Sequence, residues 1–530
     1  MNYTFIESAG LYHSGSNSER YLEVAQNIYL RGTGVTEFLP TDNFDDPNGI
    51  LLMNAAAMSA RVFGPSFTSY AITGTFFYIL FVVCLALLGW QTGSAWTGAI
   101  AAAIGGLLPA VYGHSLVFNL DLSVAAMTLL SLVLLLQTRR FSRSVWSVMF
   151  GVVAGLAIWA KISAPFCIGP AMVACFSFGL LQPRDRDACP TGVRVLNFLS
   201  ALLALAAVTL LRGGLCLLNL WQRWTSHLSP GRDEPFHDLL GHHTLELVYQ
   251  TFGPVLLVLI AAAVPLFIYR KGCRHAATIT AFFLPSLLLF FYKPESMHRF
   301  ALANLGALAV LAAAAITVTR KRQWVNAALV LVIVSASLAN LLTVAGIVTS
   351  KYCTRTQYAP RIRVLENYDT FLHSLDETLP HEKDLRVVSF RPFDQLPRFP
   401  GHYARFVIRS LRPHATVYQL DNVRSYKFFD LAARHLHEAD FLLVMRNTPK
   451  WDWPVADLRR IQTSPLVYGV MQQKTDLLIR KLEEVRLQWR AWRTIETRQR
   501  MYPGRLASQV QGIPVYVNVY KAEKPTASGK

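Results

Sequence analysis

The sequence predicts a polytopic α-helical membrane bundle of about ten spans, followed by a soluble α/β domain at the C-terminal end. Three observations lead to this prediction: a series of long apolar runs, an alternation of charge between the loops, and a change of composition after residue 350. A helix needs about 20 apolar residues to cross roughly 30 Å of hydrocarbon. Runs near this length lie at 69–90, 93–113, 117–137, 144–160, 163–181, 194–212, 250–269, 275–292, 299–318 and 325–348. Two of them, 144–160 and 275–292, are short, and 163–181 contains Pro165 and Pro170, so one segment is expected to be kinked or re-entrant.

The loop charges predict the orientation of these spans. Lys and Arg gather in four short loops, at 138–144, 182–193, 270–274 and 319–323, whereas the loops at 114–116 and 293–298 carry almost none. Short cytoplasmic loops are enriched in Lys and Arg, so the four basic loops are expected to face the cytoplasm. The chain is therefore predicted to be an integral protein of a bacterial inner membrane, with three parts: an extracytoplasmic first loop (1–68), a transmembrane helical domain (69–349) and an extracytoplasmic soluble domain (350–530).

The first 68 residues raise a question of export. They are polar and contain neither an apolar segment nor a signal peptide that could carry them across the membrane. We expect that one N-terminal span is missing from this chain. The alternative is that the following span translocates the segment.

The soluble domain predicted from residue 350 onward has the pattern of a small α/β unit. Strands are predicted at 385–390, 416–420, 441–445 and 515–520, with helices at 361–379, 402–411, 425–438 and near 472–500, and this alternation favours a partly parallel sheet. From Lys351 the chain has 30 Lys+Arg against 18 Asp+Glu. Membrane lipids with anionic headgroups, or an acidic glycan, are the expected partners of this charge, with a solvated basic face as the alternative; no nucleic acid is expected outside the cytoplasm.

Three ionisable residues lie at the predicted outer ends of spans: Asp121, Lys161 and Arg299. A charge within hydrocarbon costs about 2.5–3.5 kcal/mol on insertion scales, so its presence there calls for a reason. Their common membrane face suggests one polar cavity. Taken singly, Lys161 and Arg299 could instead extend to the interface, and Asp121 could be a helix-start residue. No Cys/His spacing typical of a metal site occurs, and no metal ligand is predicted.

Five short patterns follow one another in the membrane half. They are Asn17-Ser-Glu19-Arg-Tyr21 with Ala25, Asp45-Asp46-Pro47 leading to Arg61-Val-Phe-Gly64, the segment of Asp121, Gly155-Leu-Ala with Lys161, and His298-Arg299-Phe300. In this order they resemble the loop-one signature, the jaw-helix region, the second-loop acidic motif, the Gly-Leu-Ala…Lys signature and the Arg-Tyr element of the GT-C glycosyltransferases. These are polytopic enzymes that use lipid-linked sugars, and a C-terminal α/β domain fits their aminoarabinose- and protein-mannosyl-transferase-like branch.

The resemblance implies inverting transfer of a sugar from a polyprenyl phosphate to a lipid, glycan or protein acceptor at the outer membrane face. Glu19, with Asp46 as second choice, would be the carboxylate that activates the acceptor, and Asp121 would bind the acceptor or stabilise positive charge on the sugar. The cations that would hold the donor phosphate are Lys161, Arg299, His298 and Arg20. No cofactor is certain: some members of the superfamily need a divalent metal and others do not, so Mg²⁺ or Mn²⁺ remains open.

One departure from the family pattern keeps other functions under consideration. The loop-one aspartate of the family falls on Asn17, and an amide cannot act as a general base. Either Glu19 or Asp46 replaces it, or the chain is a catalytically inactive protein of the same fold. A lipid or solute transporter is a further alternative, although it would predict inverted repeats around a midplane site, and none is found.

Overall fold

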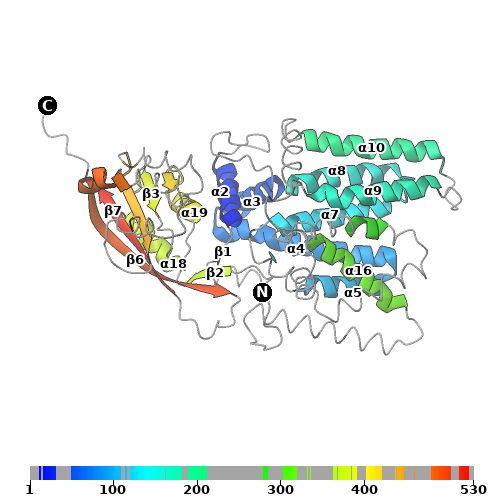
Figure 1. Ribbon diagram of the computed structural model, residues 1–530, viewed down its shortest axis with the longest axis horizontal. Helices are drawn as coiled ribbons and strands as arrows, with labels where there is room; N and C mark the ends of the chain where they lie inside the picture. Colours follow the sequence, from blue (N-terminus) through cyan, green and yellow to red (C-terminus); the bar gives the residue numbers. More distant parts are fainter. Residues whose placement is uncertain are drawn as a thin grey trace. The chain divides into compact units, whose positions relative to one another are not determined.

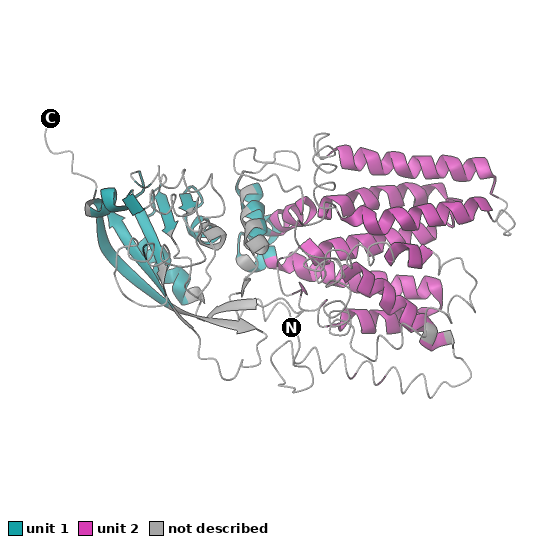
Figure 2. Cartoon of the chain, in the orientation of Figure 1, with its two compact units in different colours: residues 1–31, 60–70, 361–530 teal, residues 32–59, 71–360 magenta. Residues whose placement is uncertain are grey.

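The computed structural model forms two compact units (Figure 2). One comprises residues 1–31, 60–70 and 361–530, and the other comprises residues 32–59 and 71–360. The described stretches are 11–13, 16–31, 49–108, 120–161, 163–181, 189–211, 278–283, 302–318, 362–366, 368–382, 385–390, 401–419, 438–446, 479–480, 482–502 and 513–523, together with residues 111, 114, 115, 118, 331, 335, 436 and 459. The boundaries proposed from the sequence, at residues 68 and 349, stay a prediction.

The second unit is a bundle of helices that run side by side (Figure 1). Its helices are α3 (Ile50–Phe63) and α4 (Phe67–Thr92), which both extend into the other unit, and α5 (Ala95–Gly106), α7 (Leu120–Gln137), α8 (Ser144–Ala160), α9 (Ala164–Leu181), α10 (Thr191–Leu210) and α16 (Leu302–Val318). Among the described residues, the segments long and apolar enough to cross a membrane are Thr68–Thr92, Leu120–Gln137, Ala164–Leu181 and Thr191–Leu210. The chain is therefore an integral membrane protein.

Each helix from α4 to α10 overlaps one of the predicted apolar runs, and α16 overlaps the run 299–318. Helix α9 continues through Pro170, so the re-entrant break considered for 163–181 does not occur there. The run 250–269 lies outside the described residues, as do most of 275–292 and 325–348, so the count of about ten spans stays a prediction.

Helix α7 is the most enclosed of the four candidate spans. It packs against α8, α9 and α16, and 89% of its span is buried, compared with 22% for α10. Because lipid supplies no hydrophobic drive between helices, close packing at small residues is one of the interactions that hold such a bundle together. Gly98 of α5 provides this contact with α4, since a Cβ at this position would lie 2.3 Å from the carbonyl oxygen of Ala86.

The first unit contains a seven-stranded mixed sheet with the strand order β1-β2-β6-β7-β5-β3-β4. The strands are β1 (Leu11–His13), β2 (Ile362–Glu366), β3 (Arg386–Phe390), β4 (Thr416–Gln419), β5 (Phe441–Arg446), β6 (Trp489–Tyr502) and β7 (Ile513–Ala522). Strand β3 pairs in parallel with β4 and β5, and the other pairs are antiparallel. The four predicted strands and the partly parallel sheet are therefore confirmed, and Val387, Leu442 and Val517 lie in its buried core.

The helix predicted near 472–500 is wrong in its second half. Residues 482–485 are helical, but the chain then turns at Arg486–Gln488 and continues as the long strand β6. Its run of charged and polar residues favours a helix in isolation, whereas pairing with the apolar strand β7 favours the sheet and buries Ile495. The predicted helix at 361–379 also begins later than expected, because residues 362–366 form β2.

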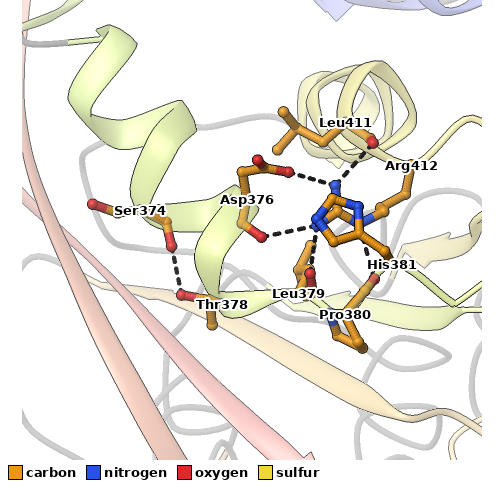
Figure 3. A network of polar contacts seen from close by, with 8 residues as sticks. All are labelled: Ser374, Asp376, Thr378, Leu379, Pro380, His381, Leu411 and Arg412. Carbon is orange, nitrogen blue, oxygen red and sulfur yellow. Dashed lines mark hydrogen bonds and ion pairs between the residues drawn. The ribbon is translucent and has the colours of Figure 1, made fainter.

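Two helices of this unit are joined by a buried arginine (Figure 3). They are α18 (Tyr368–Thr378) and α19 (Gly401–Leu411), the latter confirming the helix predicted at 402–411. Arg412, which follows α19, is 5% exposed and pairs with the carboxylate of Asp376. Its guanidinium also donates to the carbonyl oxygens of Asp376 (2.8 Å), Leu379 (2.5 Å) and Pro380 (2.8 Å). The cation therefore satisfies carbonyls at the C-terminal end of α18, which lack partners within the helix.

Helix α2 (Ser16–Arg31), from the N-terminal segment, packs within the same unit. Its buried residues include Tyr21, Leu22 and Ala25, whose spacing gives the helix one apolar face. The buried amide of Gln26 donates from Nε2 to the carbonyl oxygen of Phe406 (3.1 Å) and to Oγ of Ser410 (2.9 Å). Helix α2 is thus fixed to α19 by both apolar and polar contacts.

Candidate functional site

An ion pair links the ends of α7 and α8 within the membrane unit. Nζ of Lys161 lies 2.6 Å from Oδ1 of Asp121. The Asp121 side chain is 1% exposed and the Lys161 side chain is 12% exposed. Removing two charges from water is costly, so a pair buried to this degree is expected only where its geometry is good or its chemistry is used.

Local structure determines where each partner lies. Asp121 is in the first turn of α7, where a carboxylate interacts favourably with the positive end of the helix dipole. Lys161 is the residue at which α8 ends, because its backbone is extended (φ −163°, ψ 140°). Its N–H still donates to the carbonyl oxygen of Ala157 (3.0 Å), so the lysine leaves the helix in a defined direction.

The second carboxylate oxygen of Asp121 has no hydrogen-bond partner among the described residues. This oxygen, Oδ2, is buried. A buried acceptor without a partner is costly, since its loss of water is not compensated. The geometry therefore presents one oxygen bound by the lysine and a second that can accept a hydrogen bond or interact with a positive charge.

Gly49 lies beside both partners and was not predicted from the sequence. Its N–H donates to the carbonyl oxygen of Ala160 (3.0 Å), the residue before Lys161. A Cβ on Gly49 would lie 2.2 Å from Cδ2 of Leu120, the residue before Asp121. The signal in the sequence was the pair Asn48-Gly49 directly before the apolar helix α3, because Asn-Gly typically marks a turn.

Helices α9 and α16 meet close to their N-terminal ends. The Sγ atom of Cys167 lies 4.0 Å from Oδ1 of Asn304, and both residues belong to the first turns of their helices. In the sequence, α9 begins three residues after Lys161, and α16 begins three residues after Arg299. Arg299 itself lies outside the described residues, as do Asp46 and His298.

The structure describes the backbone of the remaining two predicted site residues, Glu19 and Arg20, within α2. Asn17 belongs to the same helix, which begins at Ser16. Successive residues of an α-helix are rotated by about 100°, so Glu19 stands about 200° around the helix from Asn17. Glu19 therefore does not lie on the same face of the helix as Asn17, the position at which the family pattern has its aspartate.

A divalent metal finds no ready ligand set among the described residues. No group of three or more His, Cys, Asp or Glu side chains comes together in the part of the chain that the structure describes. Asp121, the described acid of the candidate site, is already paired with Lys161.

Comparisons with known proteins identify the fold. No protein-family model and no curated protein matches the chain. Among solved structures, ArnT from Cupriavidus metallidurans bound to undecaprenyl phosphate is 13% identical, with a TM-score of 0.56, 100% of this chain covered and 97% of that chain. The apo state of the same ArnT is 12% identical, with a TM-score of 0.55 and coverage of 98% and 95%.

An archaeal protein is also similar. The oligosaccharyltransferase AglB from Archaeoglobus fulgidus, in complex with an inhibitory peptide and a dolichol-phosphate, is 13% identical, with a TM-score of 0.50 and coverage of 84% of this chain and 68% of that chain. At such identities the likeness concerns the fold alone. The chain has the fold of the GT-C glycosyltransferase superfamily.

Proposed function

We propose that this protein is a membrane glycosyltransferase that moves a sugar from a polyprenyl-phosphate donor to an acceptor on the extracytoplasmic face. The observation that carries the proposal is the buried pair of Asp121 and Lys161 at the ends of α7 and α8, in a chain with the GT-C fold. Two similar structures hold polyprenyl phosphates, undecaprenyl phosphate in ArnT and a dolichol-phosphate in AglB, which supports this class of donor.

We assign to Lys161 the binding of the donor phosphate. An ammonium has three N–H donors, so its pairing with one oxygen of Asp121 is compatible with a phosphate oxygen as a further partner. Transfer of the sugar leaves the phosphate with additional negative charge, and a fixed cation stabilises that charge most where water is excluded. Arg299, His298 and Arg20 are proposed as further phosphate-binding residues.

We assign to Asp121 two tasks that follow from its two oxygens. Oδ1 holds the ammonium of Lys161 in place. Oδ2, buried and without a partner among the described residues, is suited to stabilise the positive charge that develops on the sugar, or to bind the acceptor. Because one oxygen of Asp121 is engaged by Lys161, we assign proton transfer from the acceptor to an acid of the N-terminal segment.

The acceptor hydroxyl needs a carboxylate that takes its proton. Glu19 was the first choice from the sequence, but its position on α2 is on a different side from Asn17. Asp46 precedes Gly49 by three residues in the sequence, and Gly49 contacts the residues next to Asp121 and Lys161. We therefore propose Asp46 as the base, with Glu19 second, and a lipid, glycan or protein as the acceptor class.

The test is a transfer assay with the purified full chain and undecaprenyl-phosphate-linked sugars. The variants Asp46→Asn, Asp121→Asn and Lys161→Met are expected to lose at least about a hundredfold in kcat, because each removes an interaction made in the transition state. The matched control is Glu438→Gln, which neutralises an exposed acid of the other unit. Full transfer by all three variants would show that the site is wrongly assigned.

The same assay separates the alternatives. An inactive protein of this fold would bind undecaprenyl phosphate and transfer no sugar in the unmodified chain. A transporter would move its solute or lipid across a sealed vesicle even after Asp46 and Asp121 are neutralised. Sugar transfer that depends on both acids supports the proposed enzyme.

A further inference from the structure

Helix α3 begins and ends beside glycines that have the same unusual backbone conformation. Gly49 and Gly64 each have φ of 86°, in the left-handed region that residues with a Cβ rarely adopt. Their surroundings differ. A Cβ on Gly64 would meet no atom within 4 Å, whereas a Cβ on Gly49 would lie 2.2 Å from Cδ2, 3.0 Å from Cδ1 and 3.1 Å from Cγ of Leu120.

Gly49 makes one contact on each side of the ion pair. On the α8 side, its N–H satisfies the carbonyl oxygen of Ala160, which is left without a partner where the helix ends. On the α7 side, a Cβ on Gly49 would meet the side chain of Leu120, which is itself buried. Ala160 and Leu120 directly precede Lys161 and Asp121, so Gly49 lies against the residue next to each charged residue.

The carbonyl group of Gly49 also has a hydrogen-bond partner. Its carbonyl oxygen accepts the N–H of Met53 (3.0 Å), which begins the hydrogen-bonding pattern of α3. The buried side chains of Ile50, Leu52 and Met53 hold this first turn in the protein. The start of α3 is therefore packed in the protein, and its first residue is preceded by a glycine that contacts the ends of α7 and α8.

We propose that Gly49 is a positioning residue that determines the geometry of the Asp121–Lys161 pair. The inference deepens the proposed function, on which its consequence for donor binding rests. A residue with a side chain at this position would have to displace Leu120 or break the hydrogen bond to Ala160. Either change moves one charged partner relative to the other, and errors of about 1 Å at such a site cost up to roughly a hundredfold in rate.

Gly49→Ala and Gly64→Ala form a matched pair of variants. Both place a Cβ on a residue with φ of 86°, so both carry the same conformational strain at opposite ends of one helix. The first alone introduces the collision with Leu120. The additional substitution Leu120→Ala in the Gly49→Ala protein removes most of that collision and serves as the rescue.

The first measurement concerns the pair and needs no ligand. The free energy of unfolding of the full chain is measured in mixed micelles for Asp121→Asn, Lys161→Met and the double variant, and this double-mutant cycle gives the coupling between the two residues. The cycle is repeated in the unmodified, Gly49→Ala and Gly64→Ala proteins. We expect the coupling, as a ratio of unfolding constants, to fall roughly tenfold in Gly49→Ala and to stay unchanged in Gly64→Ala. Equal coupling in all three backgrounds overturns the proposal. If Gly49→Ala does not fold, the Gly49→Ala/Leu120→Ala protein is compared with Leu120→Ala instead. Because the collision is then removed, equal coupling is expected in these two proteins, and a roughly tenfold lower coupling in the double variant overturns the proposal.

The second measurement uses undecaprenyl phosphate as the probe and undecaprenol, which lacks the phosphate, as its comparison. We expect Gly49→Ala to lose about tenfold in the preference for the phosphate, Gly64→Ala to keep it, and the Leu120→Ala rescue to regain most of it. A general loss of stability would weaken both lipids alike, which would contradict a positioning role. If the unmodified chain does not distinguish the two lipids, the proposed function fails, while the coupling experiment still decides the role of Gly49.

Discussion

Replacing Asp121 and replacing Lys161 are expected to have unequal effects on stability, although each substitution breaks the same ion pair. Lys161→Met leaves a carboxylate that is 1% exposed, and Asp121→Asn leaves an ammonium that is 12% exposed on a long flexible stem. A lysine near the end of a span can move its charge toward the interface, whereas an aspartate in the first turn of an enclosed helix cannot. The charge that is left buried therefore determines which variant suffers more.

The magnitudes follow from the burial. Removing one partner of a buried pair destabilises a protein by about 3–5 kcal/mol, and we expect Lys161→Met to fall in this range. For Asp121→Asn we expect about 1–3 kcal/mol, because the ammonium can regain water and the remaining cost is that of a poorly satisfied polar group. The double variant is expected to be less destabilised than the two single effects predict, since no unpaired charge remains.

The assay is equilibrium unfolding of the full chain in mixed micelles, with the helix signal followed at increasing denaturing detergent. Glu438→Gln, which removes one partner of an exposed pair with Arg386, is the control and is expected to change stability by less than about 0.5 kcal/mol. Equal losses from Lys161→Met and Asp121→Asn would refute the argument from burial. Additive losses in the double variant would show that the two charges do not interact.

Three further predictions concern the packing around the site and in the sheet unit. Gln26→Leu removes two hydrogen bonds between α2 and α19, and we expect a loss of about 1–3 kcal/mol in the free energy of unfolding and faster hydrogen exchange of the α2 amides. Unchanged exchange rates would contradict this prediction. Arg412→Met leaves several carbonyl oxygens without a hydrogen bond and is expected to lower the free energy of unfolding by about 3 kcal/mol. The control Arg386→Met removes an exposed arginine and is expected to lower it by less than about 0.5 kcal/mol. Similar losses from the two variants would refute the role of burial. Gly98→Ala forces α4 and α5 apart and is expected to lower the free energy of unfolding by about 1–3 kcal/mol. Gly192→Ala is expected to be tolerated, because a Cβ there would meet no atom within 4 Å. Equal melting temperatures of the two variants would contradict this prediction.

The membrane helices could be predicted from the sequence because lipid imposes a requirement on every residue of a span. A contiguous apolar run of sufficient length is needed, so α4 and α7 were located to within a few residues of their ends. The sheet unit depends on contacts that are distant in the sequence. Strand β1 pairs with β2 across some 350 residues, and the polar strand β6 is stabilised by β7, so neither could be recognised from local propensity.

The candidate site was predicted in part, and for a specific physical reason. A charged residue within an apolar run is easily recognised, and this identified Asp121 and Lys161. In the structure, Nζ of Lys161 lies 2.6 Å from Oδ1 of Asp121. Gly49 was missed because a glycine has no side-chain chemistry to recognise, and its importance arises only from what a Cβ would meet. The roles of Asp121 and Lys161, and those of Glu19 and Asp46, stay predictions.

The cost of the ion pair is itself an argument for its use. Well-packed apolar side chains of similar size often stabilise a protein as much as a buried ion pair or more, so stability alone does not account for two charges at the ends of α7 and α8. The other buried polar side chains of α7, those of Ser123, Thr128 and Ser131, are uncharged and donate to carbonyl oxygens of the same helix, so Asp121 is the charged residue among its buried side chains. A charge pair that is costly to bury, next to a backbone hydrogen bond from Gly49, is the arrangement expected where a cation must be held in place for an anionic ligand before that ligand arrives.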